Sequence, residues 1–141
     1  MNNLQPYIVP RPFNGYNIPG AMQSNYLKNY SISKNYKFHL PIVEITTSNS
    51  FYLLKGFLNK NKTQHLEISV VSFFVFPIYD KQLLLKLFSD YSDLKILLHG
   101  VLEGKILTIL ELLDWSESIR NINNLTHTYN DEYLKTISSK I

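Results

Sequence analysis

The segment Leu66–Phe76, LEISVVSFFVF, is almost wholly apolar. This property restricts the folds that the chain can adopt. Strands of this kind are typical of sheets that helices cover on both faces, because neither face then needs polar side chains. Pro77 follows directly and should end the strand, since proline has no N–H group to donate to a neighbouring strand. We therefore expect Leu66–Phe76 to be the central strand of an α/β sheet.

The rest of the chain alternates between strand-like and helix-like segments. Further strands are expected at Tyr7–Val9, Lys37–Ile45 and Lys95–Glu103, and helices at about Pro19–Ser33, Phe51–Asn61, Asp80–Tyr91 and Ile106–Ile119. The apolar stripes are assigned to Met22, Tyr26 and Tyr30 in the first helix and to Tyr129, Tyr133 and Ile137 in one more. This alternation indicates βαβ units with right-handed crossovers. It predicts a three-layer αβα sandwich around a mainly parallel sheet of four or five strands.

The bulk properties of the sequence exclude several classes of protein. A length of 141 residues suits one domain, and the absence of cysteine excludes disulfides, thiolate zinc sites and cysteine nucleophiles. The net charge of +3 comes with scattered Lys residues, whereas nucleic-acid binding normally rests on clustered positive charge. The N-terminus lacks signal-peptide features, and the longest apolar run is far shorter than the roughly 20 residues that span a bilayer. We expect a soluble cytoplasmic protein that binds no nucleic acid and does not insert into membranes.

Arg11 stands directly after the first expected strand, in a loop that leads to the helix starting at Pro19. Parallel α/β sheets bind ligands at this edge, beyond the carboxyl ends of the strands. A guanidinium group can hold a phosphate or carboxylate through two hydrogen bonds, and the helix start offers free N–H groups beside it. We predict an anion site here. The alternative is that Arg11 is a solvated surface residue or pairs with an acid to hold the loop.

Glu44, His99 and Glu103 are the candidates for proton transfer. Glu44 and Glu103 stand near the ends of apolar strands, where partial burial can raise the pKa of a carboxyl group. His99 lies four residues before Glu103, so both should lie on one face of an extended strand. The alternative is that each is a hydrogen-bonded structural group. The other histidines lack metal-ligand spacing, and the chain has no GxGxxG or Walker motif, so no metal and no cofactor are expected.

A set of short motifs runs through the chain from Tyr7 to Glu103. They are Tyr7-Ile8, Arg11-Pro12-Phe13, Gly15, Ile18-Pro19, Gln23, Leu40-Pro41, Glu44, Ser72-Phe73, Phe76-Pro77, Leu98-His99 and Glu103. Together they resemble the sporadic carbohydrate cluster family, over about residues 6–120 of a single domain that spans 1–141. Pro10 stands where that family usually has Ser, and Asn17 where it has Arg. A polar, partly helical extension is expected over about 121–141.

The resemblance implies a role in bacterial surface carbohydrates, because members of that family are encoded among surface-polysaccharide genes. The predicted substrate contacts are Arg11, Phe13, Asn14, Gly15, Gln23, Ser72 and Phe76. Ser72 lacks the context of a nucleophile elbow, so the first interpretation of this residue is structural. The element order is also similar to flavodoxin-like proteins and to the catalytic domain of serine recombinases, a likeness of fold that transfers no function.

The leading hypothesis is an enzyme of O-antigen (lipopolysaccharide), capsule or related sugar biosynthesis. It would act on a phosphorylated, nucleotide-linked or acidic sugar by proton transfer, as an isomerase, epimerase or lyase does. The alternative is a non-catalytic partner or scaffold subunit in the same pathway, either a homo-oligomer or bound to a pathway enzyme. Nucleic-acid binding is the third and least favoured reading, because the positive charge is scattered.

Overall fold

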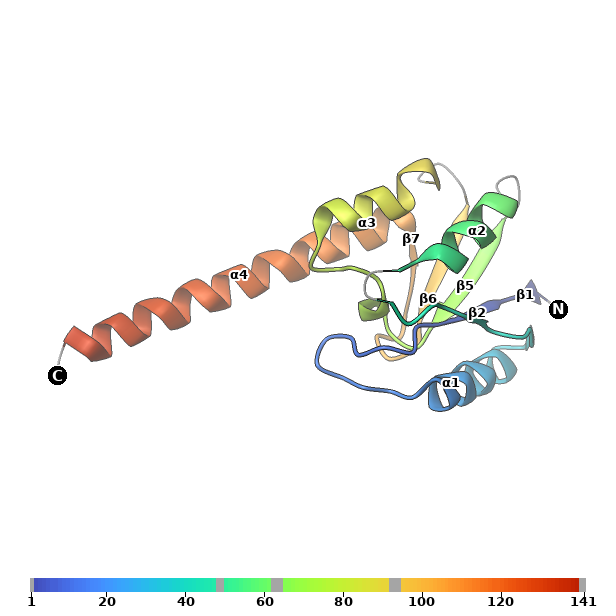
Figure 1. The fold of residues 1–141 in the computed structure, drawn as a ribbon, viewed down its shortest axis with the longest axis horizontal. Helices are drawn as coiled ribbons and strands as arrows, with labels where there is room; N and C mark the ends of the chain where they lie inside the picture. Colours follow the sequence, from blue (N-terminus) through green and yellow to red (C-terminus); the bar gives the residue numbers. More distant parts are fainter. Residues whose placement is uncertain (1, 48–49, 62–64, 92–94, 140–141) are drawn as a thin grey trace.

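The computed structural model describes residues 2–47, 50–61, 65–91 and 95–139, with the side chains of residues 3–125 within those ranges. Five strands form the main sheet, in the order β4-β2-β5-β6-β7 (Figure 1). They are β4 (Ile42–Val43), β2 (Gln5–Ile8), β5 (Leu66–Val70), β6 (Ile96–Gly100) and β7 (Lys105–Thr108). Neighbouring strands are parallel except β7, which runs antiparallel to β6. The prediction of a mainly parallel sheet is confirmed.

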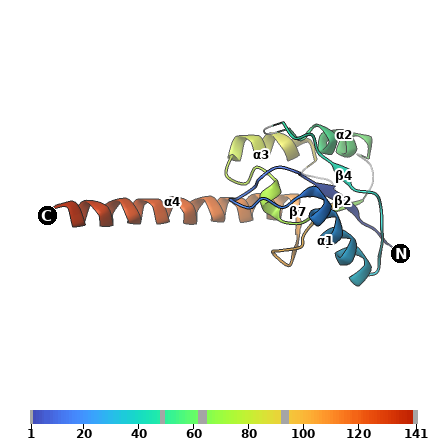
Figure 2. The same cartoon turned by 60° about the horizontal axis from the view of Figure 1, so that its bottom comes forward.

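Helices lie on both faces of this sheet (Figure 2). One face is covered by α1 (Gly20–Ser33), and the other by α2 (Tyr52–Lys60) and α3 (Lys81–Phe88), with the first turns of α4 (Ile109–Ser139) beside α3. A separate parallel pair joins β1 (Asn2–Asn3) to β3 (Tyr36–Lys37). Two short 3-10 turns, η1 (Phe73–Val75) and η2 (Ser89–Tyr91), flank α3. The protein is thus an α/β sandwich.

The two faces of β5 differ in polarity, and this difference positions the site described below. Leu66, Ile68 and Val70 are buried in the main apolar cluster, with side chains of α2, α3 and α4. Glu67 and Ser69 alternate with them and therefore lie on the opposite face, toward α1. A strand expected to be apolar on both faces thus carries two polar side chains on one of them.

The central strand is shorter than the predicted Leu66–Phe76. It ends at Val70, and the chain turns into η1 two residues later. The physical reason is Ser72, whose hydroxyl group accepts a hydrogen bond of 3.1 Å from the backbone N–H of Phe74 and so caps the 3-10 turn. Polar capping at this point competes with continued strand pairing.

Proline and turn residues account for the other differences in strand boundaries. The predicted strand Lys37–Ile45 is divided, because Pro41 separates β3 from β4. The predicted strand Lys95–Glu103 ends at Gly100, and Glu103 lies in the turn before β7. Strand β7 occupies Lys105–Thr108, so residues 106–108, which the sequence predicts at the start of a helix, are extended instead.

Helix α1 begins where predicted but buries a different stripe. Met22 and Tyr26 are 49% and 46% exposed, so the prediction that they pack inward is wrong. The buried positions are Gln23, Leu27 and Ser31, one residue further along. Gln23 tolerates burial because its side-chain N–H groups donate to the carbonyls of Val9 (2.9 Å) and Ile18 (2.8 Å).

Helix α4 is one continuous helix of 31 residues where two helices were expected. Its first turns are held by Leu112, which is buried, and by Arg120, which donates to the carbonyl of Ile78 at 2.8 Å. The rest projects away from the sandwich (Figure 1). In the part of the chain that the structure describes, no helix combines the length and the apolar character needed to cross a membrane.

Candidate functional site

Arg11 lies at the predicted edge of the sheet, but its donors are largely used by the protein itself. Its Nη1 donates to the carbonyls of Ile45 (3.0 Å) and Thr47 (3.2 Å), and its Nη2 to that of Ser50 (2.9 Å). The guanidinium carbon also lies 4.9 Å from the centre of the Phe51 ring, a cation–π distance. Arg11 therefore ties the segment after β4 to the end of β2. The alternative raised from the sequence had Arg11 hold the loop through an acid, whereas its partners in the structure are backbone carbonyls.

A hollow of about 130 Å³ lies beside Arg11 at the carboxyl ends of β2 and β5. We call it the Arg11 hollow; it is lined by Val9, Arg11, Pro12, Phe13, Phe51, Phe74, Val75, Phe76 and Pro77. Of the predicted substrate contacts, it brings together Arg11, Phe13 and Phe76. The predicted proton-transfer residues Glu44, His99 and Glu103 do not line it.

Glu44 is buried at the start of α2 and accepts four hydrogen bonds. They come from the backbone N–H groups of Ile45 (3.0 Å), Leu53 (3.1 Å) and Leu54 (3.1 Å) and from the Tyr7 hydroxyl (2.8 Å). Burial alone would raise the pKa of Glu44, but the hydrogen bonds outweigh burial and the pKa is lowered. Glu44 thus stays a carboxylate that stabilises the helix start, which is opposite to the raised pKa expected from the sequence.

Glu103 is held on the other side of the sheet from His99. Its Oε2 accepts from the Ser72 hydroxyl (2.6 Å) and its Oε1 from the backbone N–H of Phe73 (2.8 Å). A Cβ added at Gly100 would lie 2.7 Å from Glu103 Oε1. The Glu103 carboxylate therefore lies on the face of the sheet toward which a side chain at Gly100 would point. Successive strand residues point to opposite faces, so the prediction that His99 and Glu103 share a face is wrong.

Asn14 and Gly15 form a tight turn with φ of 48° and 78°, conformations that Asn and Gly tolerate. The turn is closed by the backbone hydrogen bond from Tyr16 N–H to the carbonyl of Phe13, at 2.8 Å. Asn14 Oδ1 accepts from the hydroxyl of Tyr79 at 2.9 Å, which fastens the turn to the segment before α3. These two predicted substrate contacts therefore shape the loop.

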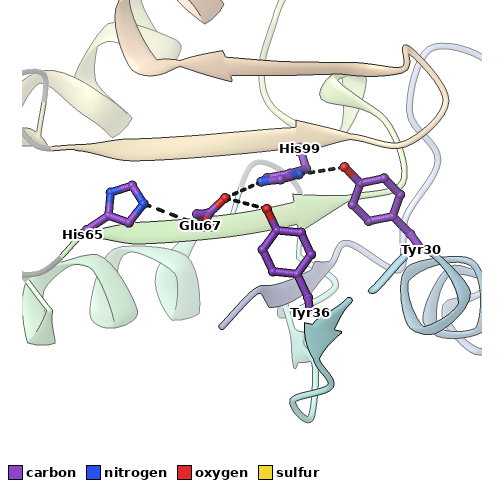
Figure 3. Close-up of polar contacts among 5 residues, drawn as sticks. All are labelled: Tyr30, Tyr36, His65, Glu67 and His99. Atoms are coloured by element: carbon purple, nitrogen blue, oxygen red, sulfur yellow. Dashed lines mark hydrogen bonds and ion pairs between the residues drawn. The ribbon is translucent and has the colours of Figure 1, made fainter. Parts of the chain in front are cut away.

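His99 lies at the centre of a hydrogen-bonded chain on the α1 face of the sheet (Figure 3). Its Nδ1 is 2.7 Å from the hydroxyl of Tyr30 in α1, and its Nε2 is 2.9 Å from Oε1 of Glu67 in β5. The hydroxyl of Tyr36 in β3 donates to the same oxygen at 3.0 Å. Four separate elements (α1, β3, β5 and β6) thus bring phenol, imidazole and carboxylate groups into one hydrogen-bonded chain.

The partners of His99 fix its tautomer. A carboxylate only accepts hydrogen bonds, so Nε2 carries the proton that points to Glu67. Nδ1 is then an acceptor, and the Tyr30 hydroxyl donates to it. We call this arrangement, from Tyr30 through His99 to Glu67, the proton chain.

Burial and the charge of Glu67 set the pKa values in the proton chain. Burial lowers the pKa of His99, and the hydrogen bond and charge of Glu67 offset only part of that effect. Burial followed by the charge of Glu67 raises the pKa of Tyr30. Burial, aided by the hydrogen bond to Glu67, raises the pKa of Tyr36 to about 12. At neutral pH the two phenols and the imidazole are therefore uncharged.

A hollow of about 260 Å³ opens beside the proton chain. We call it the Tyr30 hollow; it is lined by Tyr30, Lys34, Tyr36, His99, Gly104 and Ile106. The His99 side chain is only 1% exposed, whereas Tyr30 is partly exposed. A molecule in this hollow would therefore contact Tyr30 more readily than His99, with Lys34 also in the lining.

Compared with protein-family models, curated proteins and solved structures, the chain gives no significant match. What the site does therefore follows from its own geometry. Within the described residues, no three His, Asp or Glu side chains gather in an arrangement that could hold a metal ion.

The sequence contained a signal for the residues that were missed. Glu67 is the only charged residue in the segment Leu66–Phe76, and a charge in a strand buried on both faces requires a partner. Tyr30 was assigned to helix packing because it continues the spacing of Met22 and Tyr26. Its hydroxyl contact with His99 depends on how α1 crosses the sheet, which local spacing does not encode.

Proposed function

We propose that this protein is a cytoplasmic enzyme of bacterial surface-carbohydrate biosynthesis that acts on its sugar by proton transfer. The substrate would be a phosphorylated, nucleotide-linked or acidic sugar, and the reaction an isomerisation, epimerisation or elimination. The observation that carries the proposal is the 2.7 Å contact between the Tyr30 hydroxyl and Nδ1 of His99, backed by Glu67. The sequence resemblance to the sporadic carbohydrate cluster family supports the choice of pathway.

The proton chain supports a balanced proton transfer at the Tyr30 hydroxyl. A substrate proton passes to the Tyr30 oxygen as the proton of Tyr30 passes to Nδ1 of His99. The resulting imidazolium is stabilised by the carboxylate of Glu67 at 2.9 Å. The reverse steps return a proton to the substrate. In this proposal Tyr30 is the catalytic residue and Glu67 a positioning residue.

The lining of the Tyr30 hollow supports an anionic sugar as the substrate. Lys34 supplies an exposed positive charge, and Tyr30 and Tyr36 supply aromatic walls with hydroxyl groups. Small-molecule sites commonly combine an apolar or aromatic lining with a few polar groups of this kind. In the proposal Lys34 takes the anion-binding role predicted for Arg11, whose guanidinium group holds backbone carbonyls.

The strand order β4-β2-β5-β6-β7 supports a flavodoxin-like or recombinase-catalytic-domain-like fold as part of the proposal. If the five strands of this sheet are renumbered in chain order, their spatial order is 2-1-3-4-5. The second strand, β4, is added on one side of β2 and all later strands on the other side, so the strand order reverses between β2 and β5. Ligands of such sheets commonly bind at this reversal, where the Arg11 hollow lies. The Tyr30 hollow is on the α1 face instead, so the likeness of fold does not carry the functional proposal.

The proposal is tested by exchange of substrate hydrogen with solvent. The protein is incubated in D₂O with a panel of sugar phosphates, nucleoside diphosphate sugars and uronic acids, and deuterium incorporation is followed by NMR. Proton transfer should exchange one carbon-bound hydrogen of the true substrate class. Tyr30→Phe should slow the exchange at least about a hundredfold, since positioned acid–base groups contribute about 10²–10⁴.

The matched control is Tyr52→Phe, because Tyr52 is 71% exposed on α2 and belongs to neither hollow. It should exchange deuterium at the wild-type rate. The proposal is wrong if the wild type exchanges no sugar of the panel. It is also wrong if Tyr30→Phe and Tyr52→Phe exchange equally fast.

A non-catalytic subunit is the second candidate, and the projecting part of α4 favours it. Ile122 and Leu125 are 60% and 70% exposed on this helix, a surface suited to a partner protein. In this case the double variant Ile122→Gln, Leu125→Gln should abolish polysaccharide production in cells, and Tyr30→Phe should leave it intact. The enzyme proposal expects the reverse for Tyr30→Phe.

A further inference from the structure

The two carboxylate oxygens of Glu67 face different side chains. Oε1 accepts from both His99 and Tyr36, whereas Oε2 lies 3.7 Å from Nε2 of His65. Figure 3 shows His65 and His99 on opposite sides of the Glu67 carboxylate. A second imidazole thus stands beyond Glu67, at ion-pair distance from Oε2 and not at hydrogen-bond distance.

His65 differs from His99 in its access to water. The His65 side chain is 51% exposed and that of His99 is 1% exposed, with Glu67 between them at 10%. Exposure thus rises in steps from the buried imidazole to the surface one. An exposed imidazole can take up a proton on one ring nitrogen and release one to water from the other.

A hollow of about 250 Å³ surrounds His65, with Asn3, Gln5, His39, Asn61 and Glu67 among its polar lining residues. This volume has room for several water molecules, each of which takes about 30 Å³ in the liquid. The polar side chains offer those waters hydrogen-bond partners. Among the described residues, His39 is the other titratable side chain beside His65 and Glu67 that lines this hollow, and its Nε2 is paired with Oδ1 of Asn3 at 3.1 Å. Tyr36 reaches Glu67 from the Oε1 side.

We propose that His65 is the group through which the proton chain exchanges protons with solvent. The inference rests on the proposed function in one respect, since a bound substrate would close the Tyr30 side and leave His65 as the route to water. Once Tyr30 has passed a proton to Nδ1 of His99, the imidazolium gives its Nε2 proton to Oε1 of Glu67, so Glu67 carries a proton here in addition to its positioning role. The carboxyl group rotates and passes a proton through a water molecule in the hollow to Nε2 of His65, 3.7 Å away, and His65 releases one to solvent.

One proton thus enters at Tyr30 and one leaves at His65, with no change in electron count. The reverse passage, from water through His65 and Glu67, returns the chain to its starting protonation state. His65 is a relay residue in this scheme, because it reaches the substrate only through Glu67 and His99.

The test measures proton exchange of the His99 ring directly, without a substrate. In ¹⁵N-labelled protein, NMR reports how fast the Nε2 proton of His99 exchanges with water. His65→Gln keeps a polar side chain but cannot relay a proton, and should slow this exchange about tenfold or more. Imidazole added to the buffer should restore part of the rate, because it replaces the missing base in the hollow.

His39→Gln is the matched control, since His39 lines the same hollow but is paired with Asn3. It should leave the exchange of the His99 proton at the wild-type rate. Equal rates in His65→Gln and the wild type would overturn the inference, and so would equal slowing in both variants. Matching backbone NMR spectra would show that both variants fold.

The outcome separates this inference from the proposed function. A His65-dependent exchange of the His99 proton, together with no deuterium incorporation into any sugar, would keep the proton route and reject the sugar reaction. Sugar exchange that depends on Tyr30 but not on His65, with His99 exchange unchanged in His65→Gln, would keep the reaction and reject the route.

Discussion

The hydroxyl oxygen of Tyr30 lies 2.7 Å from Nδ1 of His99, although the two residues are 69 positions apart in the chain. Tyr30 comes from α1 and His99 from β6, so the contact exists only because α1 packs across the polar face of the sheet. Glu67 from β5 completes the arrangement on the other ring nitrogen of His99. The folded protein thus joins a phenol, an imidazole and a carboxylate in one hydrogen-bonded series.

The pKa of His99 should lie below its ordinary value of 6.5, because burial outweighs the opposing effect of Glu67. The unfolded chain then binds a proton at His99 at higher pH than the folded protein does. Folding stability from this residue is therefore complete above about pH 6.5 and is lost as the pH falls toward the lower pKa of the folded state. NMR titration of the His99 ring measures this pKa.

Glu67→Gln should lower the pKa of His99 further, since it removes the charge and the hydrogen-bond acceptor that favour the imidazolium. Tyr30 and Tyr36 are the other titratable groups that contact the ring. Glu111→Gln, in the first turn of α4, is the control and should leave the titration unchanged. A His99 midpoint above 6.5 in the wild type would contradict the assignment of a neutral buried imidazole.

Glu44→Gln should destabilise the protein by about 2–4 kcal/mol, because buried N–H donors lose a charged acceptor. The pKa of Glu44 is lowered, so its stabilisation is complete above about pH 4.3, the ordinary value for Glu, and is lost as the pH falls through the lower folded value. Urea unfolding between neutral and acidic pH measures both effects. Glu117→Gln, on the exposed surface of α4, should change stability by less than about 0.5 kcal/mol. Equal effects of the two variants would exclude the helix-start role of Glu44.

Gly100→Ala should destabilise the protein by about 1–3 kcal/mol, since the added carbon meets a packed environment. Its Cβ would lie 2.7 Å from both Glu103 Oε1 and an atom of the buried Phe73 ring. Gly56→Ala is the control, because Gly56 is inside α2 with open space around it and Ala favours a helix by about 1 kcal/mol. Thermal unfolding should show the two changes with opposite signs. A stabilised Gly100→Ala would mean that Glu103 is not held against β6.

Arg11→Lys should lower stability by about 1–3 kcal/mol, because one ammonium group cannot reach the carbonyls that the guanidinium fork holds. The expected loss is in the unfolding free energy, measured by urea denaturation, with sugar binding in the Tyr30 hollow unchanged. The anion-site prediction for Arg11 makes the opposite claim. Under that prediction, binding of a sugar phosphate would weaken while stability stayed near the wild-type value.

The sequence was a good guide to the fold where one periodicity dominates. The apolar segment Leu66–Phe76 correctly indicated the central strand. The helix expected from about Asp80 is α3, which Asp80 caps by accepting from the backbone N–H of Leu83 at 3.1 Å. Boundaries were less predictable, because they depend on single hydrogen bonds such as the one that ends the strand near Ser72. The antiparallel strand β7 was missed because Lys105–Thr108 is too short to show a period of two.

The site was predictable only in part. The predicted pairing of His99 with Glu103 is wrong, because the carboxylate partner of His99 is Glu67 on the neighbouring strand. Strand pairing decides this, since β5 and β6 align Ser69 with His99 and bring Glu67 within reach. The predicted acids Glu44 and Glu103 instead satisfy backbone N–H groups at the start of α2 and of η1.

The most direct test of the proton chain compares deuterium incorporation into sugars by the wild type, Tyr30→Phe and Tyr52→Phe. In the proposed reaction the phenol of Tyr30 contacts the substrate in the Tyr30 hollow, and His99 behind it receives the proton. We expect exchange of one carbon-bound hydrogen by the wild type and by Tyr52→Phe, and a loss of at least about a hundredfold in Tyr30→Phe. Exchange at the same rate by all three proteins would contradict the account.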